Sequence, residues 1–229
     1  MIRQLTDIEL QEIRKSILRK EISSAEILME IYDHYISHLQ EYSESEFSEQ
    51  LFELDHKFTY GYCHALQANF KTEAKKDIHQ TQWKVIRSYF CTSRWLFFAG
   101  ILVIIFTIAT QTRSERETQL MILSPLILLT ITSFIFTWKN YVKLKPIKKA
   151  FKGNGIPIQS SLALPISERM YLPVLLIYTM NFFLSRLFEL DFPYDQVQAP
   201  LATVLTAGLV LYFLSLMEVW KIKSKTALV

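Results

Sequence analysis

The chain has 229 residues, of which 50% are hydrophobic and 14% aromatic, with 5 glycines, 7 prolines and a formal net charge of +3. This charge argues against a nucleic-acid-binding protein, because the basic residues concentrate beside apolar segments and form no separate basic domain. Residues 1–94 are rich in Glu, Lys, Ser and Gln, whereas residues 95–220 hold four long apolar runs. The sequence therefore predicts an all-α protein, with a small cytoplasmic helical domain followed by a four-helix transmembrane bundle.

The N-terminal module, residues 1–75, is helical by its local signals. Thr6 followed by Glu9 has the spacing of a capping box and predicts the start of a first helix. Ser23 followed by Glu26 repeats the pattern after a tight turn. It predicts a capping box at the start of a second helix, with the sequence EILMEIYDHYISHLQEY.

Two more helices are predicted before the first apolar run. A third covers residues 45–57, and the stretch TYG (59–61) then interrupts the pattern. A fourth starts near residue 62 and continues through a helical linker, 76–94, into the membrane. The residues of the third helix expected to face inward are Phe47, Leu51, Phe52 and Leu54.

Two histidines four residues apart in the stretch YDHYISH (32–38) raise the question of a metal site. Glu30, His34 and His38 stand at positions i, i+4 and i+8, and imidazole with carboxylate suits zinc or iron. One helix face rarely supplies a complete ligand set, however, and the HxxxH step lacks the Glu of a zinc-protease HExxH. Pairing of Glu30 with His34 and of Glu41 with His38 explains the strip without a metal. We therefore expect a structural or partner-contact role, no metal and no cofactor, with a metal-responsive switch as the alternative.

Four apolar runs predict membrane-spanning helices. Each is about as long as a helix needs to cross ~30 Å of hydrocarbon at 1.5 Å per residue. The first begins far from the N-terminus, so none is expected to be a signal peptide. The predicted spans are 95–112, 119–138, 170–188 and 200–220, followed by a cytoplasmic tail over 221–229.

The orientation of these spans follows from the basic residues beside them, which tend to remain in the cytoplasm. Lys and Arg precede the first span, fill the expected loop 139–169 between the second and third spans, and recur in the tail. We expect a multi-pass protein of the inner (cytoplasmic) cell membrane with both termini in the cytoplasm. The lysines expected to contact anionic lipid headgroups are Lys143, Lys145, Lys148 and Lys149.

The middles of the four spans contain no Asp, Glu, Lys, Arg or His, which argues against a proton or ion pathway and against a catalytic site. Asn181 is the strongly polar side chain deep in a span and is expected to contact another helix. Arg186 lies near the outer end of the third span, where Glu189 can pair with it. Glu218 lies near the inner end of the fourth span, where it is expected to reach water or Lys221.

The order of helix, tight turn, EILMEIYDHYISHLQE, a Phe-containing third helix and a linker into several spans resembles a known module. It is similar to the N-terminal helical module of bacterial membrane proteins related to the HAAS signalling domain, and to Bacteroidetes membrane proteins with an acidic LxDH helix. Asp33 and His34 match the DH step, although IYDHY lacks the Leu that usually precedes the Asp. The resemblance implies a cytoplasmic module tied to a membrane domain, often associated with PadR-type transcriptional regulators. The candidate partner-binding residues are Glu30, Asp33, His34, His38 and Glu41.

These features favour a membrane-anchored regulator or interaction protein without enzymatic activity, whose N-terminal module binds a cytoplasmic partner. The alternative is a small transporter or channel subunit, and either could form a homo-oligomer. The residues that would line the pathway of such a transporter are Tyr178, Thr179, Asn181 and Ser185.

Overall fold

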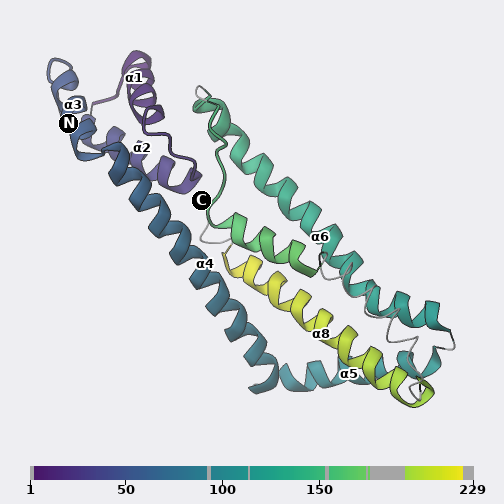
Figure 1. The fold of residues 1–229 in the computed structure, drawn as a ribbon. Helices are drawn as coiled ribbons and strands as arrows, with labels where there is room; N and C mark the ends of the chain where they lie inside the picture. Colours follow the sequence, from purple (N-terminus) through teal and green to yellow (C-terminus); the bar gives the residue numbers. More distant parts are fainter. Residues whose placement is uncertain are drawn as a thin grey trace. The chain divides into compact units, whose positions relative to one another are not determined.

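The structure is a computed structural model, and it describes residues 3–91, 94–112, 114–152, 155–173, 175 and 194–223. Within these residues all regular secondary structure is helical, which confirms the predicted all-α class (Figure 1). The helices are α1 (Asp7–Leu18), α2 (Ala25–Leu39), α3 (Phe47–Lys57), α4 (Tyr60–Cys91), α5 (Arg94–Gln111), α6 (Glu115–Ala150) and α8 (Tyr194–Lys223). Residues 163–173 are helical as well.

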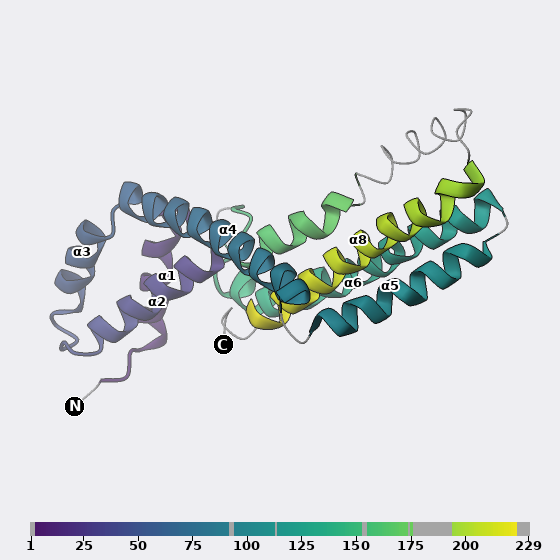
Figure 2. The same cartoon turned by 90° about the horizontal axis from the view of Figure 1, so that it is seen from below.

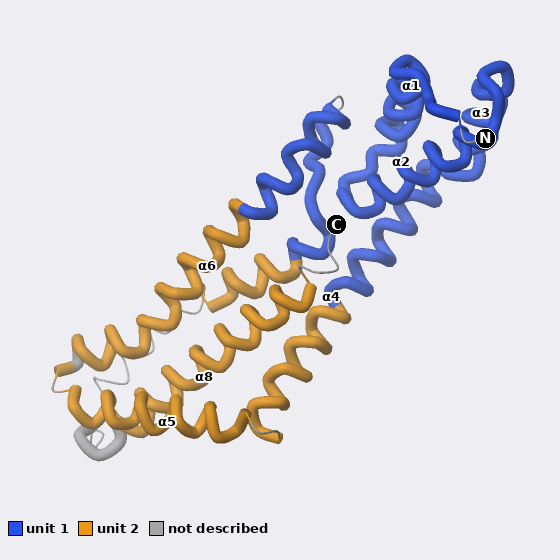
Figure 3. Tube along the Cα trace, turned by 180° about the vertical axis from the view of Figure 1, so that it is seen from behind, with its two compact units in different colours: residues 1–75, 139–164 blue, residues 76–138, 165–229 orange. Residues whose placement is uncertain are grey.

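The chain divides into two compact units, coloured separately in Figure 3. Unit 1 contains residues 1–75 and 139–164, and unit 2 contains residues 76–138 and 165–229. The long helices α4 and α6 each contribute residues to both units. Unit 1 therefore includes a segment that follows the second apolar run in the sequence.

The first helix of unit 1 begins as its sequence predicts. The Thr6 side chain accepts a hydrogen bond from the Glu9 amide at 3.3 Å, and the Glu9 carboxylate accepts one from the Thr6 amide at 2.7 Å. This arrangement is the capping box expected from the spacing. Arg3 donates to both oxygens of the same carboxylate, at 2.8 and 3.1 Å. Burial by itself would raise the pKa of Glu9, but the hydrogen bonds from Arg3 and Thr6 outweigh it and lower the pKa.

The start of α2 differs from the prediction. Its N-cap is Ser24, which makes no side-chain capping bond, so the capping box expected for Ser23 and Glu26 is wrong. The side-chain oxygen of Gln67, on α4, instead accepts from the Ser23 and Ser24 amides, at 2.9 Å each. Ser24 also forms an isolated parallel bridge with Gln159. The backbone groups at the end of the turn between α1 and α2 thus form hydrogen bonds with two distant segments of unit 1. The side chains at the start of α2 do not cap them.

The third and fourth helices follow the prediction closely. Phe47 and Leu54 are buried as expected, but Phe52 is 64% exposed, so its inward placement is wrong. The interruption near 59–61 is brief, because the Thr59 hydroxyl accepts from the Tyr62 amide and α4 begins directly after Thr59. From there α4 continues as one helix through the predicted linker to Cys91.

The lysine-rich stretch KNYVKLKPIKK is helical and forms the end of α6, so the loop predicted to begin at residue 139 is wrong over its first twelve residues. Leu144 and Phe151, two turns apart on one face, are 7% and 4% exposed. The Phe151 ring meets the Tyr32 ring of α2 edge-on, with centroids 5.2 Å apart. Apolar contacts of this face explain why the basic stretch joins unit 1.

Within unit 2, α5 packs along α8, as Figure 2 shows. The Phe136 ring of α6 meets the Trp220 ring of α8 edge-on at 5.2 Å. In the described part of the chain, three helical stretches are long and apolar enough to cross a membrane: Arg94–Gln111, Arg116–Ala150 and Ala199–Lys223. They coincide with the first, second and fourth predicted spans. Only 17% of the α5 stretch is buried inside the protein, so most of its apolar side chains face outward.

Of the third predicted span, only residues 170–173 and 175 lie in the described part of the chain. Residues 163–173 form a helix that already starts before Met170, which is fully buried. Asn181, Arg186 and the residues expected to line a transport pathway lie outside the described residues.

Candidate functional site

The five candidate partner-binding residues, Glu30, Asp33, His34, His38 and Glu41, are called the α2 strip below. Four of them are exposed, and His38 is half-buried. The face of α2 next to this strip is almost completely buried and consists of Ile27, Leu28, Ile31, Tyr35 and Leu39. The amphipathic pattern predicted from the sequence therefore places the α2 strip on the surface of unit 1.

The two histidines of the α2 strip are held by aromatic and amide neighbours. Their rings lie nearly parallel, at 6° with centroids 6.4 Å apart. The His34 ring packs edge-on against Phe58 at 5.1 Å. The His38 ring contacts Tyr42 at 5.1 Å, and its Nε2 atom lies 3.3 Å from the side-chain oxygen of Gln50.

The ion pairs expected within the α2 strip are wrong. Among the ion pairs of the described residues there is none between Glu30 and His34 or between Glu41 and His38. In that same part of the chain, no group of three or more His, Cys, Asp or Glu side chains is placed to hold a metal ion. The α2 strip is thus an exposed row of polar groups whose carboxylates are not engaged by its imidazoles.

A polar cluster that the sequence analysis missed lies on the buried side of α2. It is formed by Ser16, Lys20, Tyr35 and Asp55 and is called the Asp55 cluster here. One carboxylate oxygen of Asp55 accepts from the Tyr35 hydroxyl at 3.0 Å, from the Lys20 ammonium at 2.9 Å and from the Ser16 hydroxyl. Tyr35 is fully buried, and Ser16 is 4% exposed. Ser16 lies on α1, Lys20 follows α1, and Tyr35 lies on α2. The Asp55 carboxylate, on α3, therefore connects the three helices.

The protonation states within this cluster follow from burial and charge. Burial alone would raise the pKa of Asp55, but hydrogen bonds from Ser16, Lys20 and Tyr35 and the charge of Lys20 outweigh it and lower the pKa. Burial and the neighbouring Asp55 charge raise the pKa of the Tyr35 phenol. Burial also raises the pKa of the nearby Cys63 thiol. A buried thiol with a raised pKa is a poor nucleophile, so the cluster has the chemistry of a structural element.

A second set of contacts joins α2 to the segment before residues 163–173. The Glu26 carboxylate accepts from the Ser161 amide at 2.8 Å, from the Leu162 amide at 3.3 Å and from the Ser160 hydroxyl. These amides lie immediately before the helix, where no intrahelical acceptor is in reach of them. A carboxylate at this position satisfies the amides and favours the helix dipole. Glu26 therefore caps a distant helix, and 134 residues separate it from Ser160, which precedes that helix.

Unit 2 contains a polar cluster of its own. The side chain of Gln82, on α4, donates to the Ser215 hydroxyl at 3.3 Å and accepts a hydrogen bond from Arg169. The Tyr212 hydroxyl donates to the Arg169 carbonyl at 2.8 Å. Gln82 is 6% exposed and Ser215 fully buried, so this cluster fixes α4, the helical segment at 163–173 and α8 to one another.

The contact expected for Glu218 is different in the structure. Its carboxylate pairs with Arg94, at the start of α5, through two hydrogen bonds of 2.8 and 2.9 Å. The Arg94 guanidinium also lies over the Tyr89 ring, 5.8 Å from its centroid. The two charges lie at the start of α5 and near the end of α8, where the ion pair supports the packing of these helices.

The lysines predicted to contact lipid headgroups, Lys143, Lys145, Lys148 and Lys149, are all exposed near the end of α6. The Lys148 ammonium lies over the Tyr141 ring at 5.9 Å. Their exposure leaves these groups accessible to anions.

Comparison of the chain with protein-family models, with curated proteins and with solved structures finds no match. The function proposed below therefore rests on the chemistry and geometry of the chain itself.

Proposed function

We propose that this protein is a bacterial inner-membrane-anchored regulator, whose N-terminal helices bind a cytoplasmic protein through the α2 strip. The observation that carries this proposal is the exposed, charged α2 strip on a helix whose buried side is held by the Asp55 cluster. Glu30, Asp33, His34 and Glu41 are exposed, while the Asp55 cluster fixes the buried side of the same helix. A preorganised polar surface of this kind favours protein recognition, because little side-chain and backbone order is lost on binding.

The membrane anchor in this proposal consists of four spans with both termini in the cytoplasm. Three helices have the required length and composition, and the third apolar run supplies the fourth span. Helix α6 has 36 residues, a length of about 54 Å at 1.5 Å per residue, which exceeds the ~30 Å of bilayer hydrocarbon. Its lysine-rich end therefore extends beyond the hydrocarbon, where Lys143, Lys145 and Lys149 attract anionic headgroups.

The partner is proposed to be a cytoplasmic protein with a basic or mixed-charge surface, because three of the five residues of the α2 strip are carboxylates. The resemblance of residues 5–75 to HAAS-related modules points to a PadR-type regulator as the candidate to test first.

The proposal is tested by covalent cross-linking of the full chain in cells, followed by solubilisation in mild detergent and quantification of the captured protein. Charge reversal at Glu30 and Asp33, both to Lys, is expected to reduce capture of the partner at least about tenfold. Charge reversal at Glu49 and Glu53, also exposed and one turn apart but on α3, is the matched control and leaves capture unchanged. Equal capture by both variants, or no stoichiometric partner at all, refutes the proposal.

The membrane topology is tested independently with a protease applied to intact cells. Tags fused to either end of the chain are expected to resist digestion until the membrane is opened. Digestion of either tag in intact cells contradicts the proposed orientation.

A further inference from the structure

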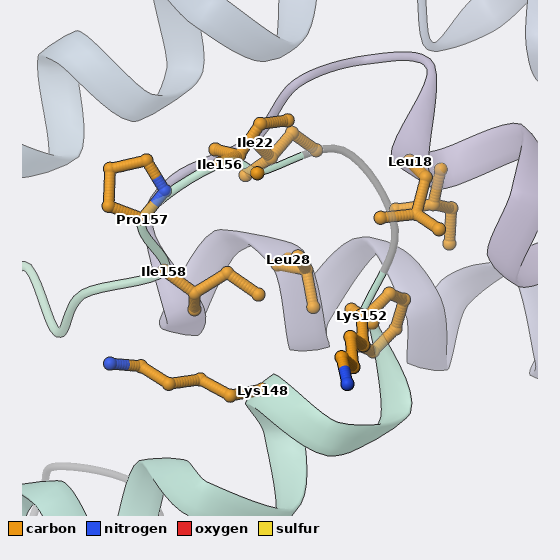
Figure 4. Close-up of a pocket in the computed structure, with 11 residues that line it drawn as sticks. Leu18, Ile22, Leu28, Lys148, Lys152, Ile156, Pro157 and Ile158 are labelled. Carbon is orange, nitrogen blue, oxygen red and sulfur yellow. The ribbon is translucent and has the colours of Figure 1, made fainter.

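Unit 1 contains a cavity of about 250 Å³ next to the turn between α1 and α2 (Figure 4). Its lining is mostly aliphatic and aromatic, and two lysines complete it. The lining residues from α1, the turn and α2 are Ile17, Leu18, Ile22 and Leu28, and those from the other side are Lys148, Phe151, Lys152, Gly155, Ile156, Pro157 and Ile158. A long apolar surface beside cationic groups is suited to an amphiphilic molecule.

The positive charge of this cavity is not neutralised by neighbouring carboxylates. Lys148 and Lys152 are one helical turn apart in sequence, both are exposed, and the lining includes no acidic residue. Neither ammonium takes part in an ion pair within the described residues. Figure 4 shows both side chains extending from the α6 side of the cavity with their ammonium groups apart, and Leu28, Ile156 and Ile158 around the remaining space. An anionic group at the lysine side would therefore gain attraction without displacing a carboxylate partner.

The backbone conformation keeps the far wall of the cavity in place. Gly155 has a positive φ of 67°, which a glycine adopts without strain, and its Cβ position is open. Ile158, three residues after Gly155, is buried, with 5% of its surface exposed. The adjoining Gln159 is fixed by hydrogen bonds to the backbone of Ser23 and Ala25, at 2.8 and 2.9 Å. The wall is thus built by backbone contacts independent of any ligand.

The size of the cavity limits the length of the apolar group it can take. A water molecule has a share of about 30 Å³ in the liquid, and a methylene group is of similar size, so the space corresponds to about eight methylene groups. This volume suits one alkyl chain of medium length and is too small for two.

We propose that the cavity binds a single-chain anionic amphiphile, with an alkyl chain among Leu18, Leu28 and Ile158 and a carboxylate attracted by the positive charge of Lys148 and Lys152. This inference goes beyond the proposed function, because it requires neither a protein partner nor the α2 strip. The cavity adds a small-molecule site to unit 1.

The binding is tested with the full chain in nanodiscs of zwitterionic phospholipid. The probe is an alkyl carboxylate with a diazirine near the end of its chain, and adducts are mapped by peptide mass spectrometry after irradiation. Adducts are expected on the peptides that contain Leu28 and Ile156–Ile158. Competition by unlabelled straight-chain carboxylates is expected to strengthen about fourfold for each methylene group, up to about eight carbons, and then to level off. Adducts spread along the apolar helices, or competition that keeps strengthening beyond that length, show partition into the bilayer and overturn the proposal.

Variants test the two lysines and the apolar part of the cavity separately. Changing both Lys148 and Lys152 to Gln is expected to weaken octanoate competition about tenfold and to leave octanol competition unchanged. Lys149→Gln, on the same helix but outside the lining, is the matched control and leaves both unchanged. Ile158→Trp, which fills the cavity, is expected to remove labelling by the probe. Equal effects of the Lys149 variant and the double variant show general attraction of anions to the lysine-rich helix and overturn the proposal, whether or not the α2 strip binds a protein.

Discussion

Replacing Asp55 with asparagine tests whether the Asp55 cluster holds the first three helices together. Asparagine keeps the shape of the side chain, but it removes the negative charge toward which Ser16, Lys20 and Tyr35 donate. The Lys20 side chain is only 10% exposed, so its ammonium would lose its counter-ion in a largely buried position. Hydrogen bonds to charged groups contribute about 1.5–3 kcal/mol each and neutral ones about 1 kcal/mol, so the change at three contacts destabilises by about 2–4 kcal/mol.

Hydrogen exchange measured by mass spectrometry on the full chain in detergent reports this loss locally, without assuming that the whole protein unfolds in one step. Amides of α1, α2 and α3 in Asp55→Asn are expected to exchange roughly 30-fold to several-hundred-fold faster than in the unsubstituted chain. Asp33→Asn, the same change at an exposed position of α2, is the control and changes stability by less than about 0.5 kcal/mol. Equal exchange rates in the two variants would refute the structural role of the cluster.

The same carboxylate predicts a pH dependence with a definite sign. Because the pKa of Asp55 is lowered in the folded protein, its stabilising effect is complete above the unfolded value of about 3.9 and disappears as the pH falls through the folded value. Protection of α1 to α3 is therefore expected to decrease on acidification below about pH 4. Asp55→Asn should lack this component of the decrease, and an identical acid profile in both proteins would contradict the assignment.

Three further predictions follow from contacts elsewhere in the chain. Glu26→Ala is expected to speed amide exchange over residues 160–164 by about ten- to a hundredfold, because it removes an acceptor shared by three donors. Glu26→Gln keeps an oxygen acceptor and should therefore have a smaller effect. In detergent, a maleimide is expected to modify the exposed Cys91 while the buried Cys63 reacts only after unfolding, and equal rates at the two thiols would contradict the burial. Reversing one charge of the Arg94–Glu218 pair should lower the midpoint of thermal unfolding in detergent, and reversing both should restore it.

Hydrogen bonds between residues close in sequence were predictable, whereas hydrogen bonds between distant segments were not. The two expected capping boxes show this difference. Thr6 and Glu9 cap each other because their donors and acceptors lie within one turn of α1. Glu26 has the same spacing from a serine, but its carboxylate is occupied by donors near residue 160. A pattern of residues three apart cannot reveal a competing partner more than a hundred positions away.

The same distinction applies to the Asp55 cluster and to the lysine-rich stretch. Asp55 follows Leu54 and lies one turn after Leu51 on α3, so its half-buried position was readable from the helical period. The donors that meet it come from α1, from the residues after α1 and from α2. The lysines after residue 139 were interpreted as a topology signal in a loop, whereas Leu144 and Phe151, seven residues apart, indicate a helix with one apolar face.

The contacts of residues 155–164 have a consequence for the order in which unit 1 can form. These residues include Gln159, which pairs with Ser24, the donors near residue 160 that contact Glu26, and the buried Ile158. The contacts of α2 are incomplete without them. They are synthesised only after the first two apolar runs, whereas α1, α2 and α3 emerge first. Chains fold progressively from the N-terminus during synthesis, so the first three helices must wait, with part of their apolar surface uncovered, until the second apolar run is complete. Synthesis of the first two apolar runs therefore precedes completion of unit 1, and the surface that carries the α2 strip gains its full set of contacts only in a chain whose first two apolar runs have already been made.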